Sequence, residues 1–192
     1  INKYSSINIY EHKKKNSKLS SQILYGEKFI ILKKYKDWYK IKTSYDKYVG
    51  FIRKKKFKKF TSKPTHKVSS LKANIFSRPI KNSRIKMKLS FSSLLHVKSS
   101  NKGFLKFDNN WIQKSDVVPL NYKEKIFKRI SIFKNVKYKW GGKKFDGIDC
   151  SGLVQLFFKF NNLYCPRDTG PQFRYFKKFK SIKKDAIIFW KG

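Results

Sequence analysis

The stretch that decides the fold is Gly147-Ile148-Asp149-Cys150-Ser151-Gly152-Leu153-Val154-Gln155, which opens a run that stays almost entirely apolar as far as Phe160. That run has the length and composition of a buried helix, and Asn161 and Asn162 indicate its end. Asp149 is a favoured N-cap residue, so we expect Cys150 to lie in the first turn of the helix. The free amides there and the positive end of the helix dipole favour a thiolate. The position therefore favours a catalytic cysteine, with a buried, inert cysteine as the alternative.

The residues around this helix, 121–192, are expected to form an α+β unit. Residues 122–130 have helical spacing, Trp140-Gly141-Gly142 interrupts it, and residues 187–190 are typical of a strand. A helix that packs against strands defines an α+β unit. The second cysteine, Cys165, lies in a short apolar turn, and we expect it to be buried and inert.

Two small β units are expected before this segment. In the first, residues 1–62, short apolar runs recur at residues 29–32, 37–41 and 48–52, which predicts a small antiparallel barrel. Residues 62–65, which include Pro64, indicate a linker. Residues 66–120 repeat the pattern less clearly, so the chain is expected to carry two related barrels in tandem. The predicted fold class is therefore multi-domain, with two small all-β barrels followed by an incomplete α+β domain, and Trp38 and Trp111 are expected in the barrel cores.

The net charge of +37 raises the question of a nucleic-acid partner. The lysines are spread from end to end, however, and arginine, the better residue for bidentate recognition of bases and phosphates, is rare. We therefore expect no specific nucleic-acid binding. A field of this sign still attracts anionic substrates and weakens with salt.

The sequence contains two cysteines and three histidines, His12, His66 and His96, without the spacing of a metal site. We expect no metal and no cofactor. No apolar run is long enough for a signal peptide or a membrane span. These features predict a cytoplasmic, monomeric protein, and a segment before Ile1 would reopen the secreted and periplasmic alternatives.

Four ordered blocks resemble the NlpC-type cysteine peptidases, which are papain-like bacterial enzymes that cleave peptidoglycan peptides. The blocks are residues 138–142, residues 147–154, Pro166-Arg167-Asp168-Thr169 with Gln172, and residues 188–192. Upstream, residues 24–27, 37–41 and 48–52 resemble the signatures of bacterial SH3-like modules, and the second unit keeps the strand rhythm but has Ser92-Ser93 where the first has its Gly-Glu turn. Two SH3-like modules before such a domain resemble the members that hydrolyse γ-D-glutamyl-diamino acid bonds in murein peptides.

The resemblance implies a role for particular residues. Cys150 would be the nucleophile, Tyr138 would lie near the oxyanion, and Trp140 would wall the substrate pocket. The residues implied to bind the peptide are Asp149, Ser151, Asp168 and Thr169, with Glu27 and Tyr48 contributed by the first SH3-like module. For Tyr48 packing within the barrel is the alternative, and for Asp168 the alternative is capping of the turn after Pro166.

The catalytic histidine of this family stands directly after the block that here is residues 188–192, and the given sequence stops at Gly192. The three histidines present lie in the β units or the linker. We therefore expect the 192-residue chain to be cut before its general base and to lack peptidase activity. Two alternatives to a peptidase stay open: a protein that binds cell-wall polymer or another polyanion and has an inert cysteine domain, and a transferase that uses the same thioester on the same scaffold.

Overall fold

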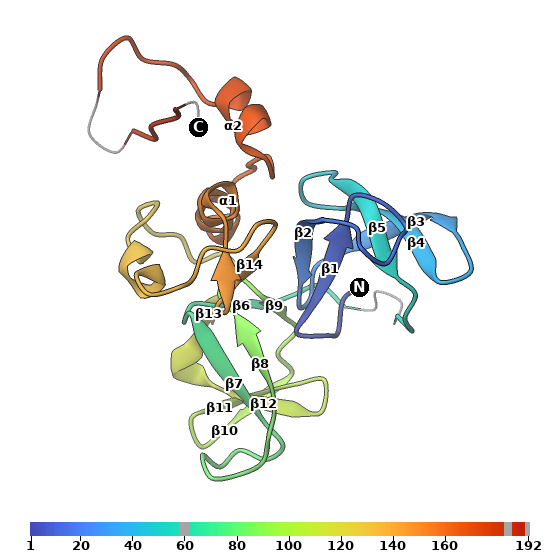
Figure 1. The fold of residues 1–192 in the computed structure, drawn as a ribbon. Coiled ribbons are helices and arrows are strands. Elements are labelled where there is room, and N and C mark those ends of the chain that lie inside the picture. The colour runs from blue at the N-terminus through green and yellow to red at the C-terminus, as the bar shows by residue number, and fades with distance from the viewer. Residues whose placement is uncertain (58–61, 183–185, 191–192) are drawn as a thin grey trace.

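A computed structural model describes residues 1–57, 62–182 and 186–190, and these form a mostly-β protein with two α-helices (Figure 1). The first part of the chain forms a five-stranded antiparallel sheet with the strand order β2-β1-β5-β4-β3. Its strands are β1 (Ser6–Tyr10), β2 (Leu19–Leu24), β3 (Phe29–Lys34), β4 (Trp38–Thr43) and β5 (Val49–Arg53).

The apolar runs of the first part do form strands, because their alternation places one set of side chains in a common core. The core residues are Ile7, Ile9, Ile23, Ile41 and Ile52. Gly50 lets β5 pass close to β1, since a Cβ there would lie 2.4 Å from Ile9 Cγ2. Trp38 is buried, as expected of a core residue, whereas Trp111 of the second part is only half-buried.

The second part forms a five-stranded sheet and a three-stranded sheet. The five-stranded sheet has the order β10-β11-β12-β7-β8, from β7 (Lys72–Phe76), β8 (Ile85–Ser90), β10 (Ser99–Asn101), β11 (Phe104–Phe107) and β12 (Asn110–Gln113). The three-stranded sheet has the order β13-β6-β9, from β6 (His66–Val68), β9 (Leu94–Leu95) and β13 (Val117–Pro119), with the 3-10 helix η1 (Lys114–Asp116) before β13. Tyr25 of the first part enters the core of the second, so the two parts pack against each other.

The third part contains the two helices, and Figure 1 shows α1 beside the first sheet and above the second. Its elements are the 3-10 helix η2 (Ile130–Phe133), the short strands β14 (Lys143–Lys144) and β15 (Gly147–Ile148), α1 (Cys150–Phe160) and α2 (Thr169–Tyr175). The buried face of α1 packs against side chains from all three parts. Leu24 comes from β2, and Phe91 follows β8 and stacks on Phe160 with ring centroids 4.5 Å apart.

The helix predicted at residues 150–160 is confirmed at both ends. The helix predicted at residues 122–130 is wrong, because this segment forms turns that lead into η2. Phe127 has a φ of 67°, which ends any regular helix, and its ring packs on Phe157 of α1. Tertiary contacts with α1 therefore override the local helical spacing.

The strand predicted at residues 187–190 is also wrong, since these residues have no strand assignment in the described part of the chain. Residues with a high strand propensity form a strand only where a neighbouring strand pairs with them. Ile188 and Trp190 are exposed, so the packing that favours a strand does not act on them.

Candidate active site

Cys150 is the first residue of α1, and its side chain is exposed. Asp149 caps the helix, with its Oδ1 accepting a hydrogen bond of 2.7 Å from the amide of Gly152. Close backbone packing holds this helix start in place. A Cβ on Gly142 would lie 2.5 Å from the carbonyl oxygen of Gly147, and one on Gly152 would lie 2.7 Å from that of Gly142. Only glycine at these positions lets the loop before β14 press on the N-terminus of α1.

A buried ion pair involves Asp149, the residue directly before Cys150. The Arg167 guanidinium binds the Asp149 carboxylate with both terminal nitrogens, Nη1 to Oδ1 at 3.0 Å and Nη2 to Oδ2 at 2.7 Å. The amide of Gly141 donates to the same Oδ2 at 2.8 Å, and the Ser151 hydroxyl accepts from Nη1 at 2.9 Å. Asp149 and Ser151 thus have partners within the protein, and their predicted contact with a substrate stays a prediction.

Three predicted residues lie in the surroundings of Cys150 with exposed side chains. Thr169 Oγ1 is 3.8 Å from Cys150 Sγ. Tyr138 forms a single bridge with Ile148 and is 65% exposed. Slight burial raises the pKa of Tyr138, and the neighbouring charges of Cys150 and Asp149 raise it further. Trp140, two residues further on, is also 65% exposed. The Cys150 sulfur is therefore exposed, with the Thr169 hydroxyl and the Tyr138 phenol in its surroundings.

Asp168 and Tyr48, two further predicted site residues, come from different parts of the chain. Asp168 is the N-cap residue of α2 and is exposed, and its pKa is raised by partial burial and by the charges of Asp149 and Asp46, against the opposing effect of Arg167. Tyr48, just before β5, is half-buried against the isoleucine core, so the packing alternative holds for part of its ring. Burial raises the pKa of its phenol, and the charge of Asp168 adds to this, which places the two side chains within electrostatic reach.

Glu27 lies near the far end of α1 and not beside Cys150. It is buried, its carboxylate forms an ion pair with Lys159, and Lys143 Nζ lies 3.8 Å away. Burial alone would raise the pKa of Glu27, but the charges of Lys143 and Lys159 outweigh it and lower the pKa. Lys159 is nine residues along α1 from Cys150, and at 1.5 Å per residue this is roughly 14 Å. The structure therefore joins the first part to the far end of α1 through Glu27 and does not bring Glu27 to the cysteine.

Sequence reasoning missed the buried polar residues that hold the site. Gln172 Nε2 donates to the carbonyl oxygens of Ser151 and Pro166, both at 2.9 Å. The rarity of arginine, six among 48 basic residues, was a weak signal for Arg167 in the sequence, and it does not separate Arg167 from exposed Arg174. Only the structure shows that Arg167 makes a bidentate contact that lysine cannot make.

The remaining chemistry-bearing groups lie outside this surface. Cys165 is fully buried, as expected, and burial raises the pKa of its thiol to about 12. His66 Nδ1 lies 2.9 Å from the Thr65 hydroxyl, His96 Nδ1 lies 2.7 Å from the Lys63 carbonyl oxygen, and His12 lies in the turn after β1.

Among the described residues, no group of three histidine, cysteine, aspartate or glutamate side chains is arranged to hold a metal ion. Within the same residues, no helix has the length and apolar character needed to cross a membrane.

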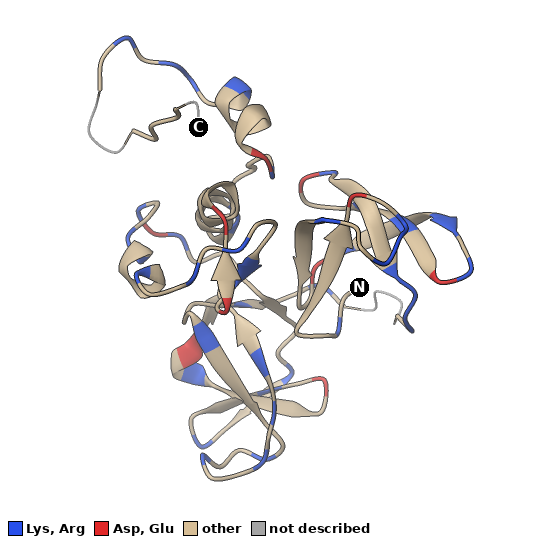
Figure 2. Ribbon diagram, in the orientation of Figure 1, with Lys and Arg blue, Asp and Glu red and all other residues tan. Residues whose placement is uncertain are grey.

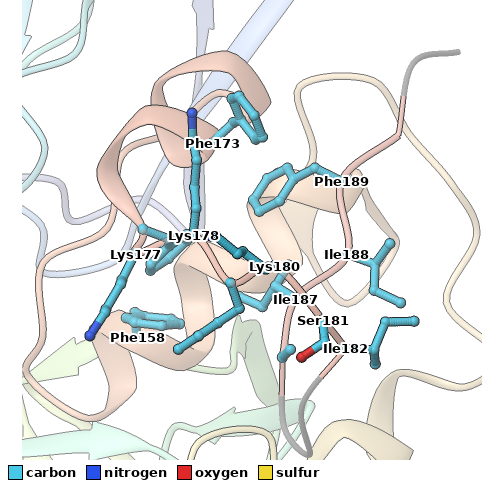
Figure 3. Close-up of a pocket in the computed structure, with 13 residues that line it drawn as sticks. Phe158, Phe173, Lys177, Lys178, Lys180, Ser181, Ile182, Ile187, Ile188 and Phe189 are labelled. Atoms are coloured by element: carbon cyan, nitrogen blue, oxygen red, sulfur yellow. The ribbon is translucent and has the colours of Figure 1, made fainter.

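A cavity of about 550 Å³ lies between α2 and the C-terminal residues, and it does not include Cys150 (Figure 3). Its walls are mainly aromatic and aliphatic, and the Phe173 and Phe189 rings pack edge to face with centroids 5.7 Å apart. Lysine and arginine residues are spread over all parts of the fold (Figure 2). Neither the cavity nor the charge marks a site as clearly as the surroundings of Cys150 do.

Two family comparisons match the segment that contains Cys150 and the first β unit. Residues 135–192 match the NlpC/P60 family, and residues 9–57 match the bacterial dipeptidyl-peptidase SH3 domain. The chain therefore carries an NlpC/P60 domain preceded by a bacterial SH3 domain.

Two curated relatives are similar over most of this chain. The gamma-D-glutamyl-L-lysine dipeptidyl-peptidase of Bacillus subtilis is 27% identical over 174 residues, covering 80% of this chain and 57% of the relative. The protein of the same name from Bacillus cereus is 23% identical over 184 residues, covering 82% and 55%. The chain thus spans little more than half the length of these relatives. A crystal structure of an NlpC/P60 family protein from Bacillus cereus shares the fold, with a TM-score of 0.76 over 96% of this chain and 78% of that chain at 18% identity.

Proposed function

We propose that this chain is part of a cysteine endopeptidase that hydrolyses γ-D-glutamyl-diamino acid bonds in peptidoglycan peptides. The observation that carries the proposal is the exposed Cys150 at the start of α1, with Thr169 at 3.8 Å and Tyr138 beside it, in the segment that matches the NlpC/P60 family. The names of the two relatives support the same substrate class.

In the proposed reaction, the Cys150 thiolate attacks the γ-carbonyl carbon of D-glutamate and forms a bond from Sγ to that carbon. The carbon–nitrogen bond to the diamino acid breaks, and the leaving amine takes up a proton. Water then hydrolyses the thioester, which releases the glutamyl carboxylate and restores the thiol. Backbone amides at the helix start and the Tyr138 hydroxyl are the donors proposed for the oxyanion.

The proposed substrate contacts come from both sides of the cysteine. Asp168 and the Tyr48 hydroxyl lie within electrostatic reach of each other, and together they suit the free amino terminus of a short peptide. Trp140 offers an exposed apolar wall. Asp149 and Ser151 stay predicted substrate contacts, and through their bonds to Arg167 they also support Cys150.

The proposal extends to the domain organisation. We infer an SH3-like domain at residues 1–62, a second SH3-like domain at residues 66–120 and a papain-like α+β domain from residue 121 to 192. The match at residues 9–57 supports the first, and the five-stranded sheet of the second part supports a related architecture there. The shared core around α1 supports one rigid framework for all three.

We also propose that the 192-residue chain by itself does not turn over substrate. A thiolate nucleophile needs a base or an ion-pair partner. His66 and His96 contact Thr65 and Lys63 in the second part, and His12 lies in the turn after β1.

The test compares the full-length protein with the 192-residue chain. Each is incubated with L-Ala-γ-D-Glu-L-Lys and with its N-acetylated form, and the release of lysine is followed by mass spectrometry. We expect the full-length protein to cleave the free-amine peptide only, Cys150→Ala to abolish this, and Cys165→Ala to retain it. Turnover that survives Cys150→Ala would sink the proposal, and turnover by the 192-residue chain would overturn its predicted inactivity. Salt-sensitive binding of wall polymer without cleavage would favour a binding protein.

A further inference from the structure

We propose that Arg167 is a positioning residue that couples the first β unit to Cys150. The inference rests on the proposed function for its catalytic meaning, but the contacts that support it are properties of the fold. The Arg167 side chain is 1% exposed, although an arginine guanidinium is among the most costly groups to bury without partners.

The partners of Arg167 account for that burial. Its two terminal nitrogens hold Asp149, Nη1 also donates to the Ser151 hydroxyl at 2.9 Å, and Nε donates to the Ser21 hydroxyl at 3.0 Å. The planar guanidinium donates four hydrogen bonds from three nitrogens, and together these bonds fix its position and orientation. A lysine, with a single ammonium on a flexible stem, has no matching geometry.

Two of these partners are the residues on either side of Cys150. Asp149 precedes the cysteine and caps α1, and Ser151 follows it in the first turn. Gln172 holds the Ser151 carbonyl oxygen at 2.9 Å from the other direction. Arg167 therefore fixes the backbone that carries the sulfur without touching the sulfur itself.

The remaining partner belongs to another part of the chain. Ser21 lies in β2 and is buried, 146 residues before Arg167. The next residue, Gln22, accepts a hydrogen bond of 2.8 Å from the amide of Lys143 in β14. Two adjacent residues of β2 thus hold the loop before α1 and the arginine beneath it.

This connection also bears on the surroundings of Cys150. Tyr48 directly precedes β5 of the sheet that contains Ser21, and its ring packs against the isoleucine core of that sheet. The Ser21–Arg167 contact is therefore one of the buried polar contacts, with Asp46–Gln155, that position the first unit and its Tyr48 relative to Cys150. A substrate held between Tyr48 and the cysteine would depend on a bond that neither residue makes.

The first experiment measures alkylation of Cys150 by iodoacetamide in the 192-residue chain, followed by intact-mass spectrometry from pH 5 to 9. It compares the unmodified chain with Arg167→Lys and with the matched control Arg174→Lys, an exposed arginine on α2. Buried Cys165 reports folding, because it should stay unmodified in every folded variant. A purely structural arginine would change the unfolding temperature and leave the pH profile of the Cys150 reaction in place.

We expect Arg167→Lys to move the pH profile of Cys150 alkylation upward by about one pH unit, since the Asp149 charge beside the sulfur loses its bidentate partner. Arg174→Lys should leave the profile unchanged. An unchanged profile in folded Arg167→Lys would overturn the inference. Should Arg167→Lys expose Cys165, Ser151→Ala replaces it and removes only the Nη1 contact to the residue after Cys150. A profile that differs from that of Arg174→Lys then supports the inference, and an unchanged profile counts against it.

The second experiment tests the connection to the first unit in the full-length protein. Ser21→Ala removes the tether and keeps the ion pair, and Ser44→Ala, an exposed serine in the same unit, is its control. We expect Ser21→Ala to raise KM for the free-amine peptide by roughly threefold to tenfold, the range of one lost hydrogen bond, with kcat changed much less. Equal KM values for the two variants would refute the coupling. If the full-length protein cleaves no peptide, the proposed function fails, whereas the alkylation profile still decides the role of Arg167.

Discussion

The side-chain amide of Gln155, on the buried face of α1, donates a hydrogen bond of 2.8 Å to the carboxylate of Asp46 in the turn between β4 and β5. The same Gln155 nitrogen donates to the Cys165 carbonyl oxygen at 3.1 Å. One glutamine thus joins the first β unit, the helix that begins at Cys150 and the segment leading to α2. The interface between the SH3 domain and the NlpC/P60 domain is therefore built from buried polar contacts with specific geometry.

Asp46→Ala should loosen this interface. The change leaves one N–H of the Gln155 amide without its acceptor, and an unpaired buried donor costs about 1–3 kcal/mol. Urea unfolding of the variant should show a loss of that size in the free energy of unfolding. Asp37→Ala, at an exposed aspartate of the same unit, serves as the control and should lie within about 0.5 kcal/mol of the unmodified chain. Equal losses for the two variants would contradict a special role for Asp46.

Glu27→Gln should destabilise the chain more strongly and remove part of its acid sensitivity. It leaves Lys159 buried without its carboxylate partner, a change that costs about 3–5 kcal/mol. The lowered pKa of Glu27 means that its stabilisation is present above the ordinary value of 4.5 and is lost as the pH falls below it. Urea unfolding at pH 7 and at pH 4 should therefore show a larger difference between the two chains at pH 7.

The control for Glu27 is Asp146→Asn, which breaks the more exposed pair with Lys144. Surface pairs contribute about 0–1 kcal/mol, so this variant should change little. A Glu27→Gln chain as stable as the Asp146→Asn chain would mean that the buried pair does not hold the first part on α1.

Lys67 should make the stability of the chain depend on pH in the alkaline range, whereas Glu27 acts in the acidic range. This lysine of β6 is 1% exposed and donates to the Tyr122 carbonyl oxygen at 2.5 Å and to the carbonyl of Phe160 at the end of α1. Burial lowers the pKa of Lys67 from 10.5 to about 8. The unfolded chain therefore binds more protons between pH 8 and 10.5, and the contribution of Lys67 to stability is present above pH 10.5 and is lost as the pH falls through 8.

The measurement is the free energy of unfolding of the unmodified chain, Lys67→Met and the exposed control Lys81→Met between pH 7 and 10. Over this range the unmodified chain should gain stability relative to Lys67→Met, and Lys81→Met should follow the unmodified chain. If the difference in free energy of unfolding between the unmodified chain and Lys67→Met stays constant across this range, the pKa of Lys67 is not lowered in the folded state.

Gly152→Ala should disturb the start of α1. An added Cβ would lie 2.7 Å from the Gly142 carbonyl oxygen and 2.8 Å from Asp149 Oδ1, so the loop and the N-cap must both shift. Overpacking of this kind costs about 1–3 kcal/mol. Gly170→Ala is the matched control, because its nearest neighbour would be the flexible end of Arg174 at 3.7 Å. Thermal unfolding should separate the two variants, and equal midpoints would argue against tight packing at the cysteine.

Local sequence signals were sufficient where a structure depends on near neighbours. The helix at Cys150–Phe160 follows from the Asp149 cap, the apolar run and the two asparagines, all within a few residues of the ends that they define. The strands of the first part follow in the same way from alternating apolar side chains that share one face. The helix prediction for residues 122–130 was wrong because Phe127 packs on Phe157 of α1, a tertiary contact that helical spacing does not encode.

The sequence by itself determined that Cys150 opens a capped helix and that Tyr138, Asp168 and Thr169 belong to its segment, because these relationships span only short stretches of chain. Tertiary structure alone decided which buried charges pair. It placed Glu27 on Lys159, far along α1 from the cysteine, and it placed Arg167 between Asp149 and Ser21. A buried charge is stable only beside partners of matching geometry. The packing of distant segments supplies them, since Glu27 is 132 residues from Lys159 and Ser21 is 146 residues from Arg167, and no local pattern records such contacts.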